Sequence, residues 1–575
     1  MVLKHILIVT YPAQSHINPA LQLAKKLITM DAHVTLLLTL HLYRRITNKI
    51  TIPGLTLLPF SDGHDAGFNA LHCSDEDHKL YLEDLKRCTS DFLSNLILST
   101  PYPFSCVVYT LLLPCVDHVA RRFNLPTTLL WIEPATVLDI FYYYFHDHAD
   151  YINQQTKNGS SVTLPGLSFS LSSRDMPSFL LRWKSGVFSN LALPMFEEHI
   201  LQLDMESTNP TVLVNTFEAL EVEALRAVDR VNMIPIGPLI PSAFLDGRDP
   251  HDTSFGGDIF QVSCDYVEWL NTKQENSVVY VSFGSYWELS KRQMEEISIA
   301  LLDCGYPFLW VIRKKVVDGK EEEEDDISFR EELEKKGKIV TWCSQVEVLS
   351  HASVGCFVTH CGWNSTMEGL VCGVPMVAFP QWTDQMTNAK MIEDVWKVGV
   401  RVDHDVNEDD GVVEGKEIKA CLDVVMGSGD HKANEFRRNA DKWKSLARDA
   451  AKDGGSSENN LRAFLEVSVY LPLPPHPPSL HLPHPLSASR IASLDRAAAT
   501  AVHRDLNRTG SCSFPPTGPK EEDLLLDATV HKARYVDLGF EGDDRCNLGP
   551  HSFEDVSEKI GFRGHFAILI KLYEV

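Results

Sequence analysis

The sequence predicts an α/β protein with two doubly wound parallel sheets, and three observations lead to this prediction. Short apolar runs typical of buried strands recur along the chain, with helical patterns between them. A second series of such runs begins near residue 277, after a stretch rich in proline and glycine. The 575 residues also exceed the usual length of a single domain. Alternating strands and helices are typical of parallel sheets covered by helices.

The first 236 residues are predicted to form one Rossmann-like domain. Its strands are expected at residues 5–10, 34–40, 106–111, 127–131 and 212–215. Residues 11–19 are interpreted as a loop. Asn18 is a favourable N-cap and Pro19 a favourable first helical residue, so a helix is expected to begin there. Another helix is expected at residues 116–123.

The second domain is predicted over residues 265–467, after an interdomain linker at residues 237–264 that concentrates proline and glycine. Its strands are expected at residues 277–283, 308–312, 339–342, 355–359 and 375–379, and its last helix at residues 456–467. Residues 472–485 then contain seven prolines. That composition cannot build a packed core, so residues 468–575 are predicted to be a Pro-rich, disordered tail.

Composition narrows the possible functions. The formal net charge is −25, and an acidic surface repels phosphate backbones and anionic lipids, so we expect neither a nucleic acid nor a membrane as partner. No apolar run approaches the ~20 residues of a membrane-spanning helix, and the first residues lack a signal-peptide cleavage site. The 13 cysteines include no Cys-x-x-Cys pair, which argues against a zinc ribbon. We expect a cytoplasmic monomer.

The densest chemical signal lies in residues 342–385. The strand predicted at residues 355–359 is followed by His360, Gly362 and Ser365, and then by a helix that ends near Gly373. A helix N-terminus presents free N–H groups and the positive end of the helix dipole. We therefore expect a phosphate cradle without lysine, in which His360 and Ser365 donate hydrogen bonds to a diphosphate.

Other residues of this stretch suit the rest of a nucleotide sugar. Glu368 lies one helical turn further on and can accept hydrogen bonds from ribose hydroxyls, while Trp342 can stack on a nucleobase. Asp384 and Gln385 offer an acceptor and an amide to sugar hydroxyls. Each residue alone also has a structural interpretation, and Trp342 and Trp382 alone are more often core residues. Their conjunction at strand ends favours a ligand site.

His16 is the second candidate. It follows the first predicted strand, at the carboxyl edge of the first sheet. A neutral imidazole at that place can take a proton from a substrate. The residues alone leave a catalytic and a structural role for His16 equally open.

Three rival enzyme classes are disfavoured. A metal-dependent transferase needs a carboxylate pair, and residues 75–77 and 403–405 have that spacing, but neither follows a convincing buried strand. The acidic run at residues 318–326 is interpreted as a solvated loop. No Gly-x-Ser-x-Gly elbow supports a hydrolase. No Gly-x-Gly-x-x-Gly follows the first strand to support a nicotinamide-dependent oxidoreductase.

Residues 342–385 resemble the signature box of the plant family 1 UDP-glycosyltransferases. The matching residues are Trp342, Gln345, His360, Cys361, Gly362, Trp363, Asn364, Ser365, Glu368, Gly373, Pro375, Pro380, Trp382, Asp384 and Gln385. Outside the box, residues 11–19, 107–114 and 280–285 resemble the subgroup that contains crocetin glucosyltransferases. The resemblance covers about residues 1–467.

This resemblance implies the GT-B fold, in which two Rossmann-like domains face each other across a cleft. The first domain would bind the acceptor and the second the UDP-sugar. The implied reaction is an inverting transfer of glucose from UDP-glucose to a hydroxyl or carboxyl of a small plant metabolite, such as a carboxylate or phenolic aglycone, without a metal. A nucleotide-sugar-binding protein with impaired catalysis is the alternative.

The resemblance also assigns roles to individual residues. The uracil and the ribose are assigned to Trp342, Cys343 and Glu368. The phosphates are assigned to Ser285, His360, Asn364 and Ser365, and the sugar to Trp363, Asp384 and Gln385. The donor site is completed by Gln345, Gly362 and Trp382. The general base of the family corresponds to His16, with Thr110 as its expected partner.

Three residues depart from the family pattern. Ser15 stands where glycine is usual, and it would be strained if that position needs a positive φ. Cys115 stands where the subgroup usually has tryptophan, which would leave room near the acceptor pocket. Thr110 stands where many relatives have an aspartate that orients the histidine, so His16 should be a weaker base. We therefore expect carboxylates, which are already ionised at pH 7, among the preferred acceptors.

Overall fold

The computed structural model describes residues 4–470, except for residues 47–51, 70–72, 101–102, 181–186, 206–208, 256–264, 286–287, 314–315, 318–319, 322–327, 404–410 and 428. The predicted tail lies outside the described residues from residue 471 onward. Most of the acidic run at residues 318–326 and residues 256–264 of the linker also lie outside them.

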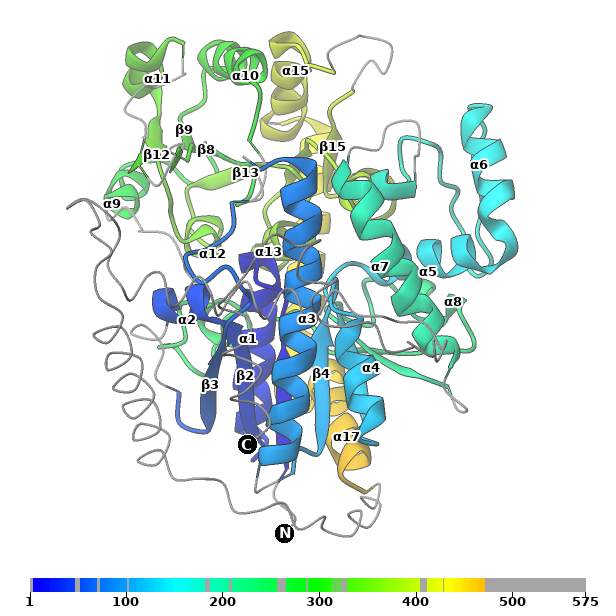
Figure 1. The fold of residues 1–575 in the computed structure, drawn as a ribbon. Helices are drawn as coiled ribbons and strands as arrows, with labels where there is room; N and C mark the ends of the chain where they lie inside the picture. Colours follow the sequence, from blue (N-terminus) through cyan, green and yellow to red (C-terminus); the bar gives the residue numbers. More distant parts are fainter. Residues whose placement is uncertain are drawn as a thin grey trace, which may run out of the picture. The chain divides into compact units, whose positions relative to one another are not determined.

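The first sheet has seven parallel strands in the order β3-β2-β1-β4-β5-β6-β7 (Figure 1). The strands are β1 (His5–Val9), β2 (His33–Thr39), β3 (Leu55–Phe60), β4 (Cys106–Thr110), β5 (Thr127–Trp131), β6 (Thr211–Val214) and β7 (Asn232–Pro235). The sequence pattern did not indicate β3 and β7. Both lie at an edge of the sheet and are only partly buried, so their apolar signal is weak.

The second sheet has six parallel strands in the order β12-β9-β8-β13-β14-β15. The strands are β8 (Val278–Ser282), β9 (Phe308–Val311), β12 (Lys338–Val340), β13 (Val354–Thr359), β14 (Met376–Ala378) and β15 (Gly399–Arg401), with β10 (Val316–Val317) and β11 (Lys320–Glu321) as a separate antiparallel pair. In both sheets the chain first moves outward to one edge and then returns to the other side of the first strand. This is the doubly wound topology of a Rossmann-like domain, so the predicted fold class is confirmed.

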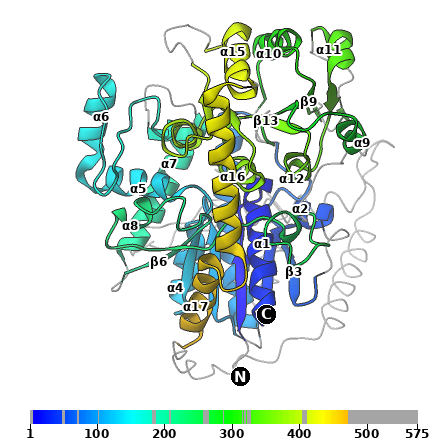
Figure 2. The same cartoon turned by 180° about the vertical axis from the view of Figure 1, so that it is seen from behind.

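Helices cover both sheets. The first sheet carries α1 (Gln14–Thr29), α2 (Leu40–Ile46), α3 (Asp75–Ser99), α4 (Cys115–Arg122), α5 (Ala135–Tyr143), α6 (Ala149–Lys157), α7 (Val187–Asp204) and α8 (Ala224–Ala227). The later helices are α9 (Tyr266–Asn271), α10 (Lys291–Cys304), α11 (Arg330–Lys336), α12 (Gln345–Leu349), α13 (Trp363–Cys372), α14 (Gln385–Lys390), α15 (Gly415–Met426), α16 (His431–Ala451) and α17 (Ser456–Tyr470). Figure 2 shows α16 leading from the second sheet towards α17, which lies beside the first.

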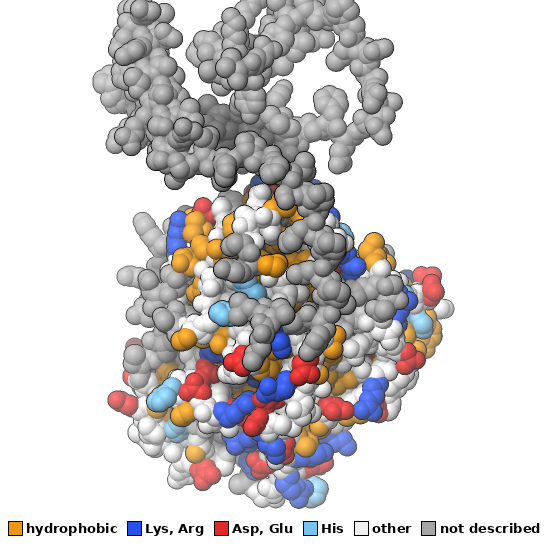
Figure 3. Space-filling model, turned by 90° about the horizontal axis from the view of Figure 1, so that it is seen from below, with side chains coloured by type: hydrophobic (Ala, Val, Ile, Leu, Met, Phe, Trp, Pro, Cys, Tyr) orange, Lys and Arg blue, Asp and Glu red, His pale blue; other side chains and the backbone are white. Residues whose placement is uncertain are grey.

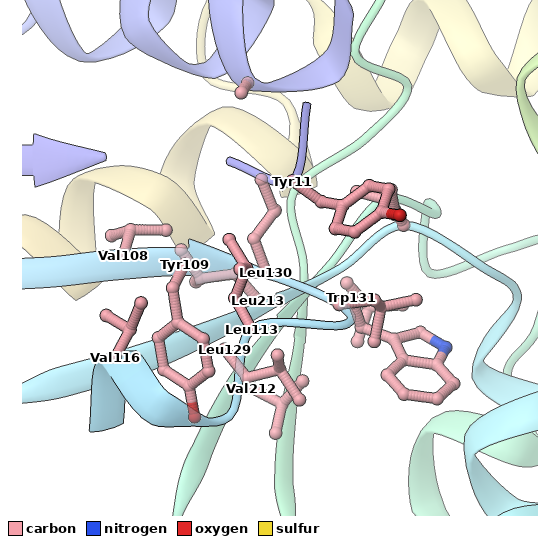
Figure 4. Close-up of a cluster of buried hydrophobic side chains, with 14 of the residues drawn as sticks. Tyr11, Val108, Tyr109, Leu113, Val116, Leu129, Leu130, Trp131, Val212 and Leu213 are labelled. Carbon is pink, nitrogen blue, oxygen red and sulfur yellow. The ribbon is translucent and has the colours of Figure 1, made fainter. Parts of the chain in front are cut away.

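Separate hydrophobic cores underlie the two sheets. Strands β4, β5 and β6 share one apolar layer, in which Trp131 is fully buried (Figure 4). Phe217 and Leu220 already pack in a core of the second sheet, and the chain then returns to the first core as far as Leu239. From Ile240 to the start of α17 the buried apolar residues belong to the cores of the second sheet. Helix α17 returns to the first core, where the Asn460 amide donates to the Pro235 carbonyl over 2.9 Å.

Helix α1 begins earlier than its local sequence signals indicate. It starts at Gln14 rather than at Pro19, and Pro19 lies inside it, so the expected loop at residues 11–19 is wrong in its second half. Proline has no N–H and cannot bond the carbonyl four residues before it. That carbonyl, of Ser15, accepts a hydrogen bond from Asn364 Nδ2 over 2.9 Å instead. A contact from the second half of the chain thus offsets the bond that Pro19 cannot make.

The visible surface carries charges of both signs. On the face shown in Figure 3, basic and acidic side chains are interspersed over the described residues. Within the described part of the chain, no helix is both long and apolar enough to cross a membrane.

Candidate active site

Both sheets place their candidate residues where the strand order reverses. His16 follows β1, Thr110 ends the neighbouring strand β4, and His360 follows β13, which neighbours β8. Ligands of doubly wound sheets bind at this reversal, outside the carboxyl ends of the strands. Residues from both edges line one cleft with about 1640 Å³ of empty space, part of it open to solvent.

His16 lies in the first turn of α1 and is 8% exposed. Its Nδ1 atom lies 3.1 Å from the Thr110 hydroxyl, which also accepts from the Tyr11 N–H over 3.0 Å. Burial lowers the pKa of His16 to about 3, so the imidazole is neutral at physiological pH. The described contacts of Nδ1 leave Nε2 as the nitrogen for a substrate.

Thr110 differs from a carboxylate in how it holds the imidazole. A hydroxyl can donate to Nδ1 or accept from it, whereas a carboxylate can only accept and fixes the proton on Nδ1. A base that works through Nε2 needs the proton on Nδ1. Thr110 therefore neither selects this tautomer nor stabilises an imidazolium by charge. The geometry agrees with the expectation of a weak base.

His360 is held in a narrow slot between two glycines. A Cβ atom added to Gly362 would lie 2.5 Å from His360 Nε2, and one added to Gly284 would lie 2.7 Å away. Gly284 also has a φ of +76°, which favours glycine. Burial is the main cause that lowers the pKa of His360 to about 4. Its Nδ1 atom is buried without a partner among the described residues, which suits a ligand atom at that place.

The helix after His360 presents its N-terminus to the cleft. Gly362 is the N-cap of α13, and Gly373, with a φ of +74°, ends it. Gln345 Nε2 donates to Ser365 Oγ over 2.8 Å and to Glu368 Oε2 over 2.9 Å, so all three side chains are held together. The N-terminus of a helix as long as α13, which has 10 residues, attracts anions.

The next two residues of α13 contact the first half of the chain. Trp363 Nε1 donates to the Asn215 carbonyl over 2.8 Å, and the Trp363 ring is buried. Asn364 donates to the Ser15 carbonyl, as described above. The Trp363 indole N–H is thus already used, and its backbone remains for a ligand.

The expected nucleotide-binding residues lie on the same side of the cleft as α13, after strands of the second sheet. Trp342 follows β12 by two residues and is half-buried in the cleft wall. Burial raises the pKa of the neighbouring Cys343 thiol to about 12, so that side chain stays protonated. The carbonyl of Ser285 accepts from Arg313 over 2.5 Å. Arg313 was not predicted from the sequence. Its charge contributes to the lowered pKa of His360 and adds a cation behind the cradle.

Trp382, Asp384 and Gln385 follow β14 at the same cleft. Burial raises the pKa of Asp384 to about 6, although Thr383 and Asn388 donate to its oxygens over 2.7 and 2.6 Å. Gln385 Oε1 accepts from the Trp382 N–H over 3.1 Å, which orients its amide group.

All the expected donor-site residues and His16 line this one cleft, and Thr110 lies behind His16. Ser15 lies in α1 and is absent from the residues with positive φ, so the expected strain is wrong. Cys115 is buried at the start of α4 and is not among the cleft residues, so the expected extra room is wrong as well.

The two carboxylate pairs have other roles or fall partly outside the description. Asp77 closes a capping box with Ser74 at the start of α3. Asp403 pairs with Arg174 over 3.1 Å, while residues 404–405 lie outside the described residues. Among the residues that the structure describes, no group of three metal-ligating side chains is found.

Glu133 is a cleft residue that the sequence analysis missed. It follows β5 by two residues and lines the cleft together with Asp384. A single glutamate after a strand forms no motif. Its place at a predicted strand end was the signal that could have found it.

Comparisons with known proteins agree with this geometry. A family model described as UDP-glucoronosyl and UDP-glucosyl transferase matches residues 252–434. Phloretin 4'-O-glucosyltransferase of Malus domestica is 54% identical over 485 residues, which cover 81% of this chain and 98% of that protein. Crocetin glucosyltransferase, chloroplastic, of Gardenia jasminoides is 52% identical over 469 residues, 80% and 97% of the two chains. The crystal structure of Os79 from O. sativa in complex with UDP matches with a TM-score of 0.68 and 30% identity, over 80% of this chain and 100% of that one.

Proposed function

The chain belongs to the plant family 1 UDP-glycosyltransferases, and we propose that it transfers glucose from UDP-glucose, with inversion, to an oxygen of a small plant metabolite. As a member of that family it is a UDP-sugar-dependent glycosyltransferase. The observation that carries the proposal is the shared cleft, where the α13 N-terminus and the unpartnered His360 Nδ1 face the same space as His16. The glucosyltransferase names of the relatives support glucose as the sugar.

The donor would lie along the wall formed by the second sheet. The diphosphate would bind at the α13 N-terminus, and its sites are Ser285, His360, Asn364 and Ser365. The uracil and ribose would bind at Trp342, Cys343 and Glu368, where Gln345 already orients Glu368 over 2.9 Å. The glucose would contact the Trp363 backbone, Asp384 and Gln385, with Trp382 and Gly362 shaping the site.

In the proposed reaction the acceptor oxygen attacks the anomeric carbon from the side opposite UDP. The new carbon–oxygen bond forms as the bond to the diphosphate breaks, and the electron pair of that bond leaves with UDP. The helix N-terminus and the side-chain donors stabilise the charge that the leaving diphosphate gains. We propose that no metal is needed, so EDTA should leave turnover unchanged, and a large loss would favour a metal-dependent transferase.

His16 matters only for acceptors that carry a proton on the attacking oxygen. A phenol must lose its proton to His16 Nε2, whereas a carboxylate with a pKa of about 4 is already ionised at pH 7. Because burial lowers the pKa of His16 to about 3 and Thr110 gives it no charge, His16 is a weak base. Carboxylates, which would give glucose esters, are therefore proposed among the preferred acceptors.

His16→Ala tests this proposal with a matched pair of acceptors. General-base catalysis is worth about 10²–10⁴-fold, so turnover of a phenol should fall within that range, while turnover of a related carboxylic acid should fall less than about tenfold. An equal loss with both acceptors would contradict the proposed role. UDP-glucose affinity is the control and should not change.

A binding protein without catalysis is the weaker alternative. Its grounds are Ser15, Cys115 and a tail that matches nothing in the family. Ser15 has no positive φ, Cys115 is not among the cleft residues, and the tail lies outside the described residues from residue 471 onward. UDP binding without transfer to any phenol or carboxylate would nevertheless establish it, so a screen of both acceptor classes decides between the two.

The domain division is also proposed. Apart from Phe217 and Leu220, the buried apolar residues up to Leu239 belong to the first core, which supports a boundary within the linker. The packing of α17 on the first core supports counting it in the enzyme body. Deleting residues 471–575 should leave UDP-glucose affinity intact. A cytoplasmic monomer remains the prediction from sequence, and light scattering checks the oligomeric state.

A further inference from the structure

Glu133 places an acidic side chain in the cleft that the proposed donor site does not use. The residue is partly exposed to the cleft, but its Oε2 atom is buried and has no hydrogen-bond partner among the described residues. A buried carboxyl oxygen without a partner costs free energy. A group from a bound ligand can supply that partner.

Glu133 lies just ahead of α5, but its side chain does not cap this helix. The N–H groups of Ala135 and Thr136 donate to the Glu221 carboxylate over 3.1 and 3.0 Å, and the Thr136 hydroxyl donates to it over 2.9 Å. The N-terminus of α5 therefore already has an anionic partner. The carboxyl group of Glu133 is left for the cleft.

Asp384 approaches Glu133 from the second sheet. Burial and the charge of Asp384 both raise the pKa of Glu133 well above its usual range, burial being the larger cause. Compared with an exposed glutamate, Glu133 keeps its proton to a higher pH. In its protonated form a carboxyl group offers one donor and additional acceptor capacity. A sugar hydroxyl, which both donates and accepts, matches this pair of groups.

We propose that Glu133 binds a hydroxyl of the transferred sugar from the side opposite Asp384 and so helps to select which sugar is transferred. This inference rests on the proposed function, because it takes Asp384 as a sugar contact. The ionised form of Asp384 would repel a diphosphate, whose proposed place is the α13 N-terminus. The acceptor side of the cleft is apolar at Leu111, Leu112 and Phe179, so the hydroxyl-rich sugar is the better match for Glu133.

Binding measurements with UDP and UDP-sugars test the proposal without requiring turnover. Glu133→Leu should leave the Kd of UDP within about twofold and weaken UDP-glucose about tenfold, the loss expected for one buried hydrogen bond. Glu133→Gln keeps a donor and an acceptor and should recover most of that loss. A comparison of UDP-glucose, UDP-galactose and UDP-xylose identifies the hydroxyl, because galactose carries its 4-hydroxyl in the other orientation and xylose lacks the 6-hydroxymethyl group. The sugar whose matching hydroxyl is moved or missing should lose no affinity in Glu133→Leu. Glu275→Leu, at an exposed glutamate outside the cleft, is the control.

The possible outcomes separate the inference from the proposed function. UDP-glucose affinity unchanged in Glu133→Leu overturns the inference, and a rise in acceptor KM alone would assign Glu133 to the acceptor. If Glu133→Leu weakens UDP as much as UDP-glucose, the inference is also overturned, because the substitution then affects the phosphate site rather than the sugar site. If Glu133→Leu unfolds, Glu133→Met is measured in its place. A wild-type enzyme that binds UDP-glucose but transfers to no acceptor refutes the proposed function and leaves the inference standing.

Discussion

The proposed donor wall, on the second sheet, and the proposed acceptor wall, on the first, differ in how many of their side chains are tied to one another. Each wall leaves a buried atom without a described partner, His360 Nδ1 on the donor wall and Glu133 Oε2 on the acceptor wall. On the donor wall, Gln345 holds Ser365 and Glu368 within 2.9 Å, and Trp363 is bonded to Asn215. On the acceptor wall, His16 has a single hydroxyl as its described side-chain partner, and Glu133 leaves a buried oxygen unpaired. The donor wall is thus prepared for its ligand before the ligand arrives.

This difference indicates where the specificity of the enzyme can change. A site whose side chains are tied to one another tolerates few substitutions, because each change breaks several hydrogen bonds. A site with loosely held groups can accept new partners. We therefore expect changes on the donor wall to abolish function and changes on the acceptor wall to adjust it.

The largest effect is expected at Gly362. In Gly362→Ala the new Cβ would lie 2.5 Å from His360 Nε2 and displace that ring from its buried slot. UDP-glucose affinity should fall on the order of 100-fold, as for the loss of two hydrogen bonds to a charged group. Adding His360→Ala should make the double variant no worse than His360→Ala alone. The control is Gly305→Ala, outside the cleft, where the Cβ meets open space and any loss comes from the φ of +76° alone, so UDP-glucose affinity should not change.

Calorimetry with UDP-glucose measures this effect. If Gly362→Ala bound UDP-glucose as tightly as wild type, the prediction that the donor wall is preorganised for its ligand would be wrong.

The second effect concerns stability on the acceptor side. His199 on α7 is 1% exposed, neither ring nitrogen has a partner among the described residues, and burial lowers its pKa to about 3. The unfolded chain protonates this histidine below about pH 6.5 while the folded chain does not, so its contribution destabilises the fold as the pH falls from 6.5 towards 3. The free energy of unfolding of His199→Leu, measured relative to wild type, should therefore be about 2 kcal/mol higher at pH 5 than at pH 7.5.

Urea unfolding at the two pH values measures that difference, and His251→Leu, at an exposed histidine, is the comparison. If the gain in stability of His199→Leu did not depend on pH, the packing of the leucine rather than the ionisation of His199 would explain that gain.

A smaller effect is expected at Thr110. In Thr110→Asp a carboxylate would face His16 Nδ1, raise the pKa of the imidazole and fix its proton on Nδ1. Turnover of phenols should rise about tenfold, a gain of about one pKa unit in base strength, while turnover of carboxylic acids should change little. Initial rates with the matched acceptor pair decide the outcome. An equal change with both acceptors would show that Thr110 acts only on the fold.

The smallest effect is expected at Ser15. Since Ser15 is helical, Ser15→Gly removes no strain and costs about 0.5 kcal/mol of stability through helix propensity. Turnover should remain within about twofold of wild type, because the carbonyl that Asn364 contacts is unchanged. A marked gain in turnover would show that glycine serves the active site there after all.

The sequence could predict the donor wall because its signals are local. Within 44 residues, one strand end, a glycine, a helix start and its acidic residue lie in fixed order, and the structure places all of them at one cleft. Most interior strands were likewise visible as apolar runs. The edge strands were not, because β7 is short and β3 only partly buried.

The acceptor wall depends on contacts between distant residues, which local patterns do not show. The start of α1 was predicted at the wrong residue because the helix-start preferences of Asn18 and Pro19 are local. They take no account of Asn364, 345 residues beyond Pro19, whose amide satisfies the Ser15 carbonyl. Glu133 looked like an ordinary residue ahead of a helix, because its possible capping role is taken by the distant Glu221.

Pro19 also makes an empty donor site distinguishable from a filled one. Without its N–H, the Ser15 carbonyl takes the amide of Asn364, the same amide that the proposed diphosphate would use. If the proposed diphosphate takes this amide, an arriving nucleotide sugar would exchange a bond between the two halves of the enzyme for a bond to itself. Donor binding would then weaken the contact between the two halves by about 1 kcal/mol, the contribution of one hydrogen bond. Because Pro19 leaves the Ser15 carbonyl without a helical partner, this residue would set how strongly Asn364 ties the two halves together before the donor binds.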